Sequence, residues 1–383
     1  QNYEYDLMSH AKLMDKYVGK TIKLIEWKNY QDRKDVVEAK LLSNNSGEIY
    51  QIGKEIYLGH PGYKVLPEIP ENLIAKPTLT WIYDNQKSSP HTLEVSYLTG
   101  NIEWKADYVL VLNQADTLGG LSGWVTVNNQ SGATYQDAKL KLIAGTIHRA
   151  PTHFRQEQLV DYDMMARASR SKSSFVEKGF FEYHIYDLQR RTTIKDRQTK
   201  QISLLDAEGV KIEKEMLVYG RQNYYTSRYH QRDPKQPVNV YVLFENAKEN
   251  QLGMPLPEGI VRLYKKDSDA SLQFIGEDRI RHTPKDEEVR LKVGEAFDVV
   301  AERKQTDFRE LGTSTFETAW ELTLRNHKEE AVTVGLIEPM MGTWRIIQSS
   351  HPYNKEDAFT IRFDVPVPQD GEVKVTYRVR VGL

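Results

Sequence analysis

Alternation of apolar and polar residues with a period of two is the feature of this sequence that most restricts its fold. The clearest run lies at the C-terminus, where Val373, Val375, Tyr377, Val379 and Val381 alternate with polar residues. Successive side chains of a strand point to opposite faces, so this pattern predicts a half-buried β-strand. Residues 361–367 repeat the pattern, and a Pro-Gln-Asp-Gly turn after them predicts that the two strands form a hairpin.

Strand periodicity recurs along most of the chain, for example in residues 238–244, 320–324 and 140–142. The 22 Tyr, 11 Phe and 6 Trp agree with it, because aromatic residues favour the pleated, half-buried surface of a sheet. A helix-like period is confined to residues 7–17, where apolar side chains could line one face of a short helix. The sequence therefore predicts an all-β fold with a short N-terminal helix.

The N-terminal part is predicted to be a separate small unit. Residues 1–17 are a short helix or linker, and residues 18–75 hold four to five short apolar runs divided by turn signals. This number of short strands favours a small β-barrel-like unit. Pro67 and Pro70 cannot lie in a central strand, so they indicate an extended connector and a boundary near residue 76.

Three strands that end in asparagine indicate a repeated module beyond this boundary. They end at Asn128, Asn246 and Asn326, and each is followed by another strand, a polar stretch and a final alternating strand. Asparagine tolerates the left-handed conformation of a tight turn, which gives the pattern a mechanical reason. It predicts two or three immunoglobulin-like β-sandwich modules in series, or else only the likeness that strand-turn-strand segments share in any β protein.

The predicted modules are residues 76–213, 214–303 and 304–383, the last an immunoglobulin-like sandwich. Strand periodicity lapses in residues 146–178, which include a basic, serine-rich run. Long segments without secondary structure are uncommon inside compact domains, so we expect a mobile surface loop there.

Charge and cysteine content exclude several classes of function. The 52 Lys and Arg residues nearly balance 54 Asp and Glu, which leaves no overall attraction to nucleic acid or anionic lipid. The absence of Cys excludes disulfides, thiolate metal sites and a cysteine nucleophile, and it favours an exported protein. No apolar run reaches the roughly 18 residues of a membrane-spanning helix. No cofactor and no metal is predicted.

One aromatic and basic string is the candidate binding surface. Residues 221–230 read Arg-Gln-Asn-Tyr-Tyr-Thr-Ser-Arg-Tyr-His, and aromatic faces beside arginines suit stacking on bases or sugars. The candidate residues are Arg221, Tyr224, Tyr225, Arg228 and Tyr229. The alternative is an exposed, tyrosine-rich loop without a ligand.

The densest cluster of ionisable residues predicts either an ion network or an acid-base site. It comprises Glu277, Asp278, Arg281, His282 and Asp298. Paired carboxylates beside a histidine could act as general acid and base, but neighbouring strand residues point to opposite faces. A surface or inter-domain ion network is therefore favoured.

Other motifs are better explained by local structure. His148 and His153 flank a proline and lack the glutamate of a zinc hydrolase motif, so they are expected to be solvated loop residues. The acidic residues of 266–269 lack the glycine and distal glutamate of a calcium loop and predict a hairpin turn. The glycines of 119–123 lead into a strand, so a tight turn is favoured over a phosphate-binding loop.

A set of ordered motifs resembles a conserved bacterial domain of unknown function, which is found in mucoidy-inhibitor-A-like proteins. The motifs include Gly-Trp-Val-Thr-Val-Asn-Asn at 123–129 and Leu-Pro-Glu-Gly at 256–259. The others lie at residues 96–98, 102–108, 144–145, 183–188, 260–264, 274–278 and 293–299. The resemblance covers about residues 75–383. It implies an exported protein and supplies no catalytic residues.

The predicted function is that of a non-enzymatic, exported, modular β-sandwich protein of the cell envelope or surface, a scaffold or interaction module. Its partner would be a protein or an envelope polymer, and its location periplasmic, secreted or surface-associated. The alternative is a hydrolase of an envelope polymer that uses Glu277, Asp278 or Asp298 at a domain junction. A third hypothesis is nucleic-acid binding through residues 221–230, but a nucleic-acid partner is not expected.

Overall fold

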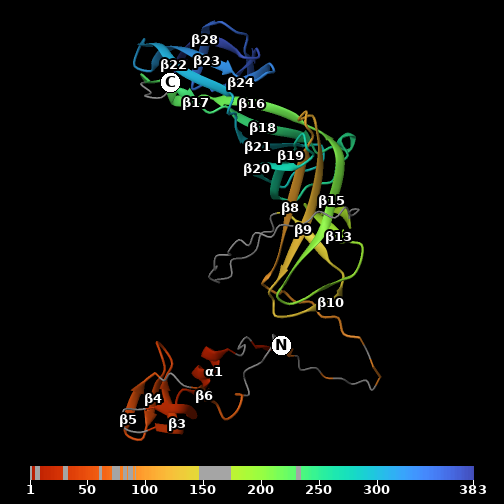
Figure 1. Ribbon diagram of the computed structural model, residues 1–383, viewed down its shortest axis with the longest axis vertical. Coiled ribbons are helices and arrows are strands. Elements are labelled where there is room, and N and C mark those ends of the chain that lie inside the picture. Colours follow the sequence, from red (N-terminus) through yellow and green to blue (C-terminus); the bar gives the residue numbers. More distant parts are fainter. Residues whose placement is uncertain are drawn as a thin grey trace. The chain divides into compact units, whose positions relative to one another are not determined.

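The computed structural model describes residues 2–4, 9–28, 33–59, 63–70, 78–80, 84, 89–90, 92–145, 174–229 and 234–383 (Figure 1). These residues form an all-β protein with one short α-helix, which confirms the predicted fold class. The chain divides into two compact units. One consists of Gln1–Ile102, Asn128–Gln136 and Thr193–Gln198, and the other of Glu103–Val127, Asp137–Thr192 and Thr199–Leu383.

An antiparallel sheet and one helix form the N-terminal part of the first unit. The sheet order is β5-β4-β3-β2-β6. The elements are α1 (His10–Tyr17), β2 (Thr21–Lys28), β3 (Arg33–Ser43), β4 (Ile49–Ile52), β5 (Glu55–Leu58) and β6 (Tyr63–Val65). The Ser9 side chain caps the helix by accepting a hydrogen bond from the Lys12 amide. Met14 and Tyr17 lie on the helix face that packs against the sheet, and both are buried in its core. A short pair, β1 (Asn2–Glu4) and β7 (Thr78–Thr80), completes the described strands of this part.

A five-stranded sheet in the order β15-β9-β8-β19-β20 carries the candidate site. Its strands are β8 (Ile102–Leu112), β9 (Leu118–Asn129), β15 (Gln198–Lys211), β19 (Gly259–Lys266) and β20 (Leu272–Ile280). Next in the chain are β10 (Tyr135–Ala138), β11 (Lys141–Ala144), β12 (Phe175–Phe180), β13 (Tyr183–Leu188) and β14 (Thr192–Ile194). β11, β13 and β12 form a three-stranded sheet, whereas β10 pairs with β14.

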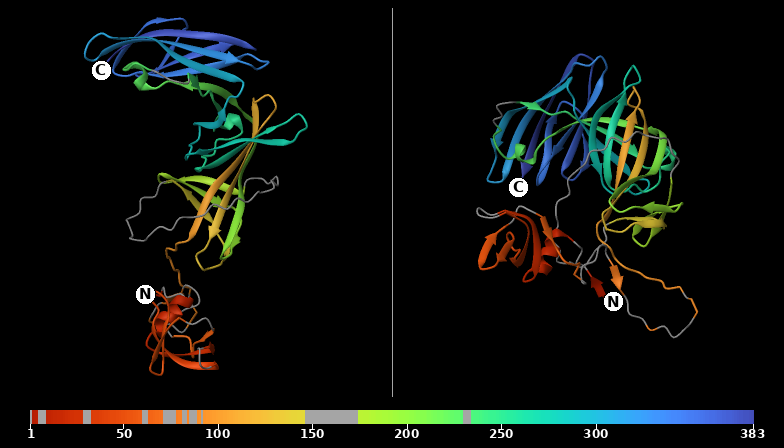
Figure 2. Two further views of the ribbon diagram at one scale, coloured as in Figure 1. Left: turned by 60° about the vertical axis from the view of Figure 1, so that its left-hand side comes forward. Right: turned by 60° about the horizontal axis from the view of Figure 1, so that its bottom comes forward.

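Two further sheets share one core and form a β-sandwich (Figure 2). The first, in its spatial order, contains β21 (Glu288–Glu295), β18 (Asn239–Glu245), β16 (Glu213–Tyr219), β24 (Val332–Pro339), β27 (Thr360–Val367) and β26 (Asn354–Asp357). The second contains β17 (Lys235–Gln236), β22 (Val299–Glu310), β23 (Thr315–Asn326), β28 (Gly371–Gly382) and β25 (Thr343–Ser349). Leu336 and Phe363 of the first sheet and Leu322 and Val379 of the second are fully buried in the shared core. We call this part the C-terminal sandwich.

Strand pairing does not follow the predicted module boundaries. The boundary between residues 303 and 304 falls inside β22, and that between residues 213 and 214 falls at the first residue of β16. β19 pairs in parallel with β8, and β16 pairs in parallel with β24, so each module boundary is crossed by a sheet. Parallel pairs need long crossover connections, which local sequence patterns do not reveal.

Two local predictions need correction. Gly119, Gly120 and Gly123 lie within β9 and not in a tight turn, and none of them has a positive φ. A Cβ at Gly119 would meet the side chain of Leu110 at 2.9 Å, so packing between side chains limits this position. Most of the predicted loop of residues 146–178 lies outside the described residues, as do His148 and His153. Its last residues belong to β12.

Buried asparagines form the same corner three times. Asn129, Asn246 and Asn326 are fully buried, and each side-chain amide donates one bond to the following loop and one to a more distant carbonyl. The loop acceptors are the carbonyls of Ala133, Met254 and Glu330, at 2.8–2.9 Å. The distant acceptors are the carbonyls of Lys195, Pro284 and Pro368, at 2.8–3.0 Å.

The three corners also agree in backbone conformation. Each distant acceptor lies two residues before a residue with positive φ, which is Arg197 (54°), Asp286 (63°) or Asp370 (44°). The first corner is formed by Asn129 and not by Asn128, because Asn129 shares the buried face of β9 with Val125 and Val127. The repeated asparagine thus has a physical counterpart, shifted by one residue in its first copy, but the expected reason is wrong: none of these asparagines has a positive φ, and each acts through the hydrogen bonds of its buried amide.

Candidate functional site

A cavity of about 240 Å³ lies where β19 begins beside β8. The parallel pairing starts with Gly259 opposite Ala106, so the first residues of β8 extend beyond it. The wall contains Trp104 and Ile143 as apolar groups and Asp107, Glu258, Arg279 and His282 as polar ones. We call this the β8–β19 cavity. Gly259 permits the close approach of the two strands, because a Cβ there would overlap the backbone of Ala106.

Two buried tyrosines fix the loop that carries Glu258. The Tyr108 hydroxyl donates to the Pro257 carbonyl at 2.8 Å, and the Tyr186 hydroxyl donates to the Pro255 carbonyl at 2.7 Å. Burial raises the pKa of both tyrosines well above the ordinary value, so both stay protonated donors near neutral pH. The loop is therefore held before any ligand arrives.

His282 holds the same loop from the other side. Its Nδ1 accepts from the Glu258 amide at 3.1 Å, and the backbones of Leu256 and Thr283 exchange two hydrogen bonds of 2.8 and 2.9 Å. Because Nδ1 accepts, the ring proton of the neutral imidazole is on Nε2, which is the nitrogen left to donate to a ligand.

Asp107 is the most buried charged group of the cavity wall, with 8% of its surface exposed. It accepts from the Thr126 hydroxyl at 3.1 Å and lies 3.6 Å from the Lys105 ammonium and 3.7 Å from the Arg262 guanidinium. Arg262 in turn lies 3.5 Å from Glu277. These contacts balance the charge of Asp107 and fix its side chain.

The predicted acid-base cluster is not brought together. Glu277 is half exposed and paired with Arg262, whereas Asp278 accepts from the backbone amides of Arg279 and Lys292 at 2.8 and 2.7 Å. Asp298 precedes β22 in a different sheet, and within the described part of the chain it forms no hydrogen bond or ion pair with either carboxylate. Of the cluster, His282 alone lines the cavity, and Arg281 is exposed.

The predicted binding string is divided between core and surface. Tyr224 and Tyr225 lie in a 3₁₀ helix, η1 (Gln222–Tyr225), and are 1% and 0% exposed. The Tyr224 ring packs 5.2 Å from that of Trp320, and Tyr229 packs 4.6 Å from Tyr224. The prediction that Tyr224 and Tyr225 stack on a ligand is therefore wrong, because their rings are enclosed by the C-terminal sandwich.

Arg221 and Arg228 are exposed and Tyr229 is half-buried, so the string leaves two arginines and part of one aromatic ring at the surface. His230 lies outside the described residues. The turn at residues 266–269 joins β19 to β20, and Asp269 accepts from the Ser271 amide at 2.8 Å, which confirms the predicted hairpin.

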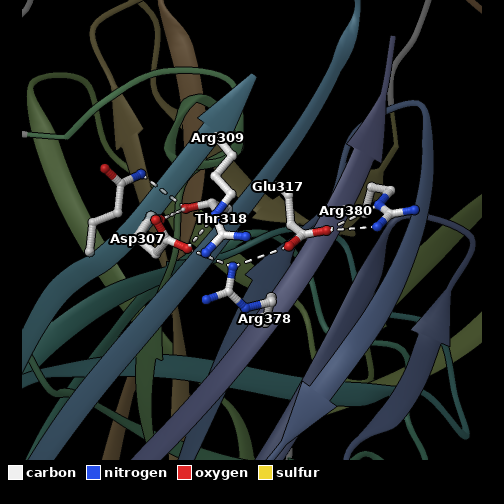
Figure 3. Close-up of polar contacts among 7 residues, drawn as sticks. Asp307, Arg309, Glu317, Thr318, Arg378 and Arg380 are labelled. Atoms are coloured by element: carbon white, nitrogen blue, oxygen red, sulfur yellow. Dashed lines mark hydrogen bonds and ion pairs between the residues drawn. The ribbon is translucent and has the colours of Figure 1, made fainter. Parts of the chain in front are cut away.

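A network of five charges covers part of the outer face of β22, β23 and β28 (Figure 3). Arg378 lies 2.8 Å from Asp307 and 3.1 Å from Glu317, and Arg380 lies 2.8 Å from Glu317. Arg309 lies 3.0 Å from Asp307. Each carboxylate is thus paired with two arginines, which stabilise the sheet face and leave no free acid or base.

Sequence analysis missed the β8–β19 cavity because its wall combines residues 104–107 and 143–145 with residues between 258 and 282, which are more than 100 residues further along the chain. Within the described ranges, no group of three or more His, Cys, Asp or Glu residues could hold a metal ion. No helix of these ranges is long and apolar enough to cross a membrane.

The chain is an all-β protein with a C-terminal sandwich and, beside its five-stranded sheet, a small polar cavity with a partly exposed wall. Comparisons with protein-family models, with curated proteins and with solved structures found no match for the chain.

Proposed function

We propose that this chain is a non-enzymatic, exported interaction module of the cell envelope or surface, in which immunoglobulin-like sandwiches and a small N-terminal barrel act as a scaffold. Its partner is a protein or an envelope polymer. The observation that carries the proposal is the way the polar groups of the β8–β19 cavity are held. Asp107 is balanced by two cations, and the Glu258 loop is fixed by Tyr108, Tyr186 and His282. A rigid site of this kind suits binding.

The resemblance to mucoidy-inhibitor-A-like proteins supports export and an envelope role. The absence of Cys from the whole sequence agrees with it. The three asparagine corners support a repeated strand-corner motif, and two of them, at Asn246 and Asn326, end strands of the two sheets of the C-terminal sandwich.

A hydrolase is the competing function. The separation of Asp298 from Glu277 and Asp278 argues against an acid-base site formed by these three carboxylates. General acid-base catalysis needs its groups within hydrogen-bonding reach of one substrate. If the chain were a hydrolase, its general acid and base would be Asp107 and Glu258, because these are the carboxylates that line the cavity.

One experiment separates the two functions. The full chain is incubated with insoluble cell-wall polymer and with envelope membranes, and both co-sedimentation and the release of soluble fragments are measured. We expect co-sedimentation without release. Fragment release that is lost in both Asp107→Asn and Glu258→Gln would establish a hydrolase, and a chain that stays in the supernatant with every fraction would overturn the interaction module. Fractionation of cells that produce the full-length gene product tests export, and recovery in the cytoplasm would contradict it.

A further inference from the structure

We propose that the β8–β19 cavity binds one neutral, hydroxyl-rich sugar residue of a polysaccharide. This inference rests on the proposed interaction function, because it names the chemistry of the ligand at the site described above. It is carried by three properties of the cavity: its size, its charge balance and the mixture of groups in its wall.

The size selects a ligand of about one ring. Pockets for drug-sized ligands have volumes of roughly 300–1,000 Å³. The β8–β19 cavity, at about 240 Å³, lies below that range. A folded peptide segment does not fit such a space, whereas one ring of a chain that continues into solvent does.

The charge balance selects a neutral ligand. Lys105 and Arg279 contribute two positive charges to the wall, and Asp107 and Glu258 contribute two negative ones, which leaves a net charge of zero with His282 neutral. A phosphate, a sulfate or a polyanion would need an excess of cations. The cavity offers none.

The wall combines an apolar face with hydrogen-bonding groups of both kinds. Trp104 lies partly exposed in it and is braced by Tyr186, whose ring centroid is 6.5 Å away. A sugar ring has a C–H face that packs on such an aromatic surface, and hydroxyls that both donate and accept.

The polar groups that face a ligand are Glu258 and Arg279. Their side chains form no ion pair within the described part of the chain, in contrast to Asp107. Glu258 can accept from sugar hydroxyls, and Arg279 can donate to them. The fixed backbone of residues 255–258 holds the acceptor in place, so little conformational entropy is lost on binding.

Calorimetric titration of the full chain with neutral oligosaccharides tests the proposal. The probes are the β-1,4-linked tetramers of glucose and of N-acetylglucosamine, and maltotetraose. We expect a dissociation constant of about 1 mM for at least one probe, as ligand efficiency predicts for a single ring. Affinity should be the same at about 0.05 and 0.5 M salt, because a neutral ligand is not screened.

Variants assign the binding to the cavity. Trp104→Ala and Glu258→Gln should each weaken binding about tenfold, the effect of losing one stacking or charge-assisted contact. Trp344→Ala, a half-exposed tryptophan of the C-terminal sandwich, is the matched control and should bind as the parent chain does. Because Trp104→Ala could disturb the fold, Arg279→Ala, which removes an exposed side chain, is titrated as well and its thermal unfolding is compared with that of the parent.

The outcomes are distinct. Absence of binding to every neutral probe at 10 mM or so, or binding that all three cavity variants retain, would overturn the sugar site. Preference for heparin or polygalacturonate with steep salt dependence would overturn it as well, since it would mark an anion site. If the cavity variants fail to affect envelope co-sedimentation while the parent chain sediments, the sugar proposal falls and the interaction module stands.

Discussion

The guanidinium of Arg303 and the carboxylate of Glu338 form an ion pair inside the C-terminal sandwich, and neither side chain has any exposed surface. The two hydrogen bonds measure 2.7 and 3.1 Å, and the Tyr225 hydroxyl donates to the same carboxylate at 2.5 Å. Arg303 lies on β22 and Glu338 on β24, so the pair joins the two sheets across the core. Burial alone lowers the pKa of Arg303, but the Glu338 carboxylate outweighs burial and raises it, so the arginine stays charged.

Removal of one partner should destabilise the sandwich far more than removal of both. Glu338→Ala leaves Arg303 charged, buried and unpaired, which typically costs about 3–5 kcal/mol. The double variant Arg303→Met, Glu338→Leu has no buried charge and should regain most of that loss, because apolar side chains of similar volume can replace such a pair. Urea unfolding measures both. A double variant as unstable as the single one would show that shape, and not charge, is what the pair provides.

Substitution of Gly220 should destabilise the C-terminal sandwich, because the Glu338 carboxylate occupies the space that a side chain would need. A Cβ at this position would overlap the Glu338 carboxylate and come within 3.3 Å of Pro339. Glu338 is held by Arg303 and Tyr225 and cannot move away, so Gly220→Ala should cost about 1–3 kcal/mol in thermal or urea unfolding. The control is Gly312→Ala in the turn after β22, where no atom lies within 4 Å of the added carbon and the unfolding free energy should barely change.

The buried amide of Asn326 should contribute more to the free energy of unfolding than an exposed polar side chain does. It donates to Glu330 and Pro368 at 2.8 and 2.9 Å, and its Oδ1 accepts from the Lys328 amide at 3.1 Å. Asn326→Ala leaves these backbone groups without partners, so we expect a loss of about 2–3 kcal/mol in unfolding free energy. Asn354→Ala, at an exposed position of β26, is the control and should be close to neutral. Equal stabilities of the two variants would contradict a structural role for the corner.

Strand periodicity predicts the C-terminal sandwich well because one face of each strand is buried. Val375, Tyr377, Val379 and Val381 are at most 2% exposed, and β27 and β28 fall where the alternation places them. The predicted hairpin is wrong, because β27 pairs with β24 and β28 pairs with β23 and β25, so the turn between them connects the two sheets of the sandwich. The same alternation of inward and outward residues also indicates the buried ion pair of Arg303 and Glu338. Glu338 follows Val334 and Leu336 on the inward face of β24, so a charged residue at an inward position was a readable sign of a buried partner.

The candidate site could not be predicted in the same way. Tyr224 and Tyr225 lie in an irregular segment where no period distinguishes an inward ring from an outward one. The β8–β19 cavity depends on Gly259 pairing with Ala106 across more than 150 residues of chain. Parallel pairing of this kind is fixed by the whole fold, and no local pattern encodes it.

Acid should destabilise the C-terminal sandwich through Glu317. Hydrogen bonds from Arg380 and then Arg378 hold the pKa of Glu317 below its ordinary value. A carboxylate with a lowered folded-state pKa contributes stability that is fully present above its unfolded pKa, about 4.3, and is lost as pH falls through the folded value. Unfolding free energy measured from pH 7 down to about 3 should therefore decline below pH 4.3 or so, and the decline should be shallower in Glu317→Gln. Glu321→Gln on the same strand is the control, because Glu321 forms no ion pair within the described residues, and it should follow the parent curve. Coincident curves for Glu317→Gln and the parent chain would show that the arginines do not stabilise the folded carboxylate.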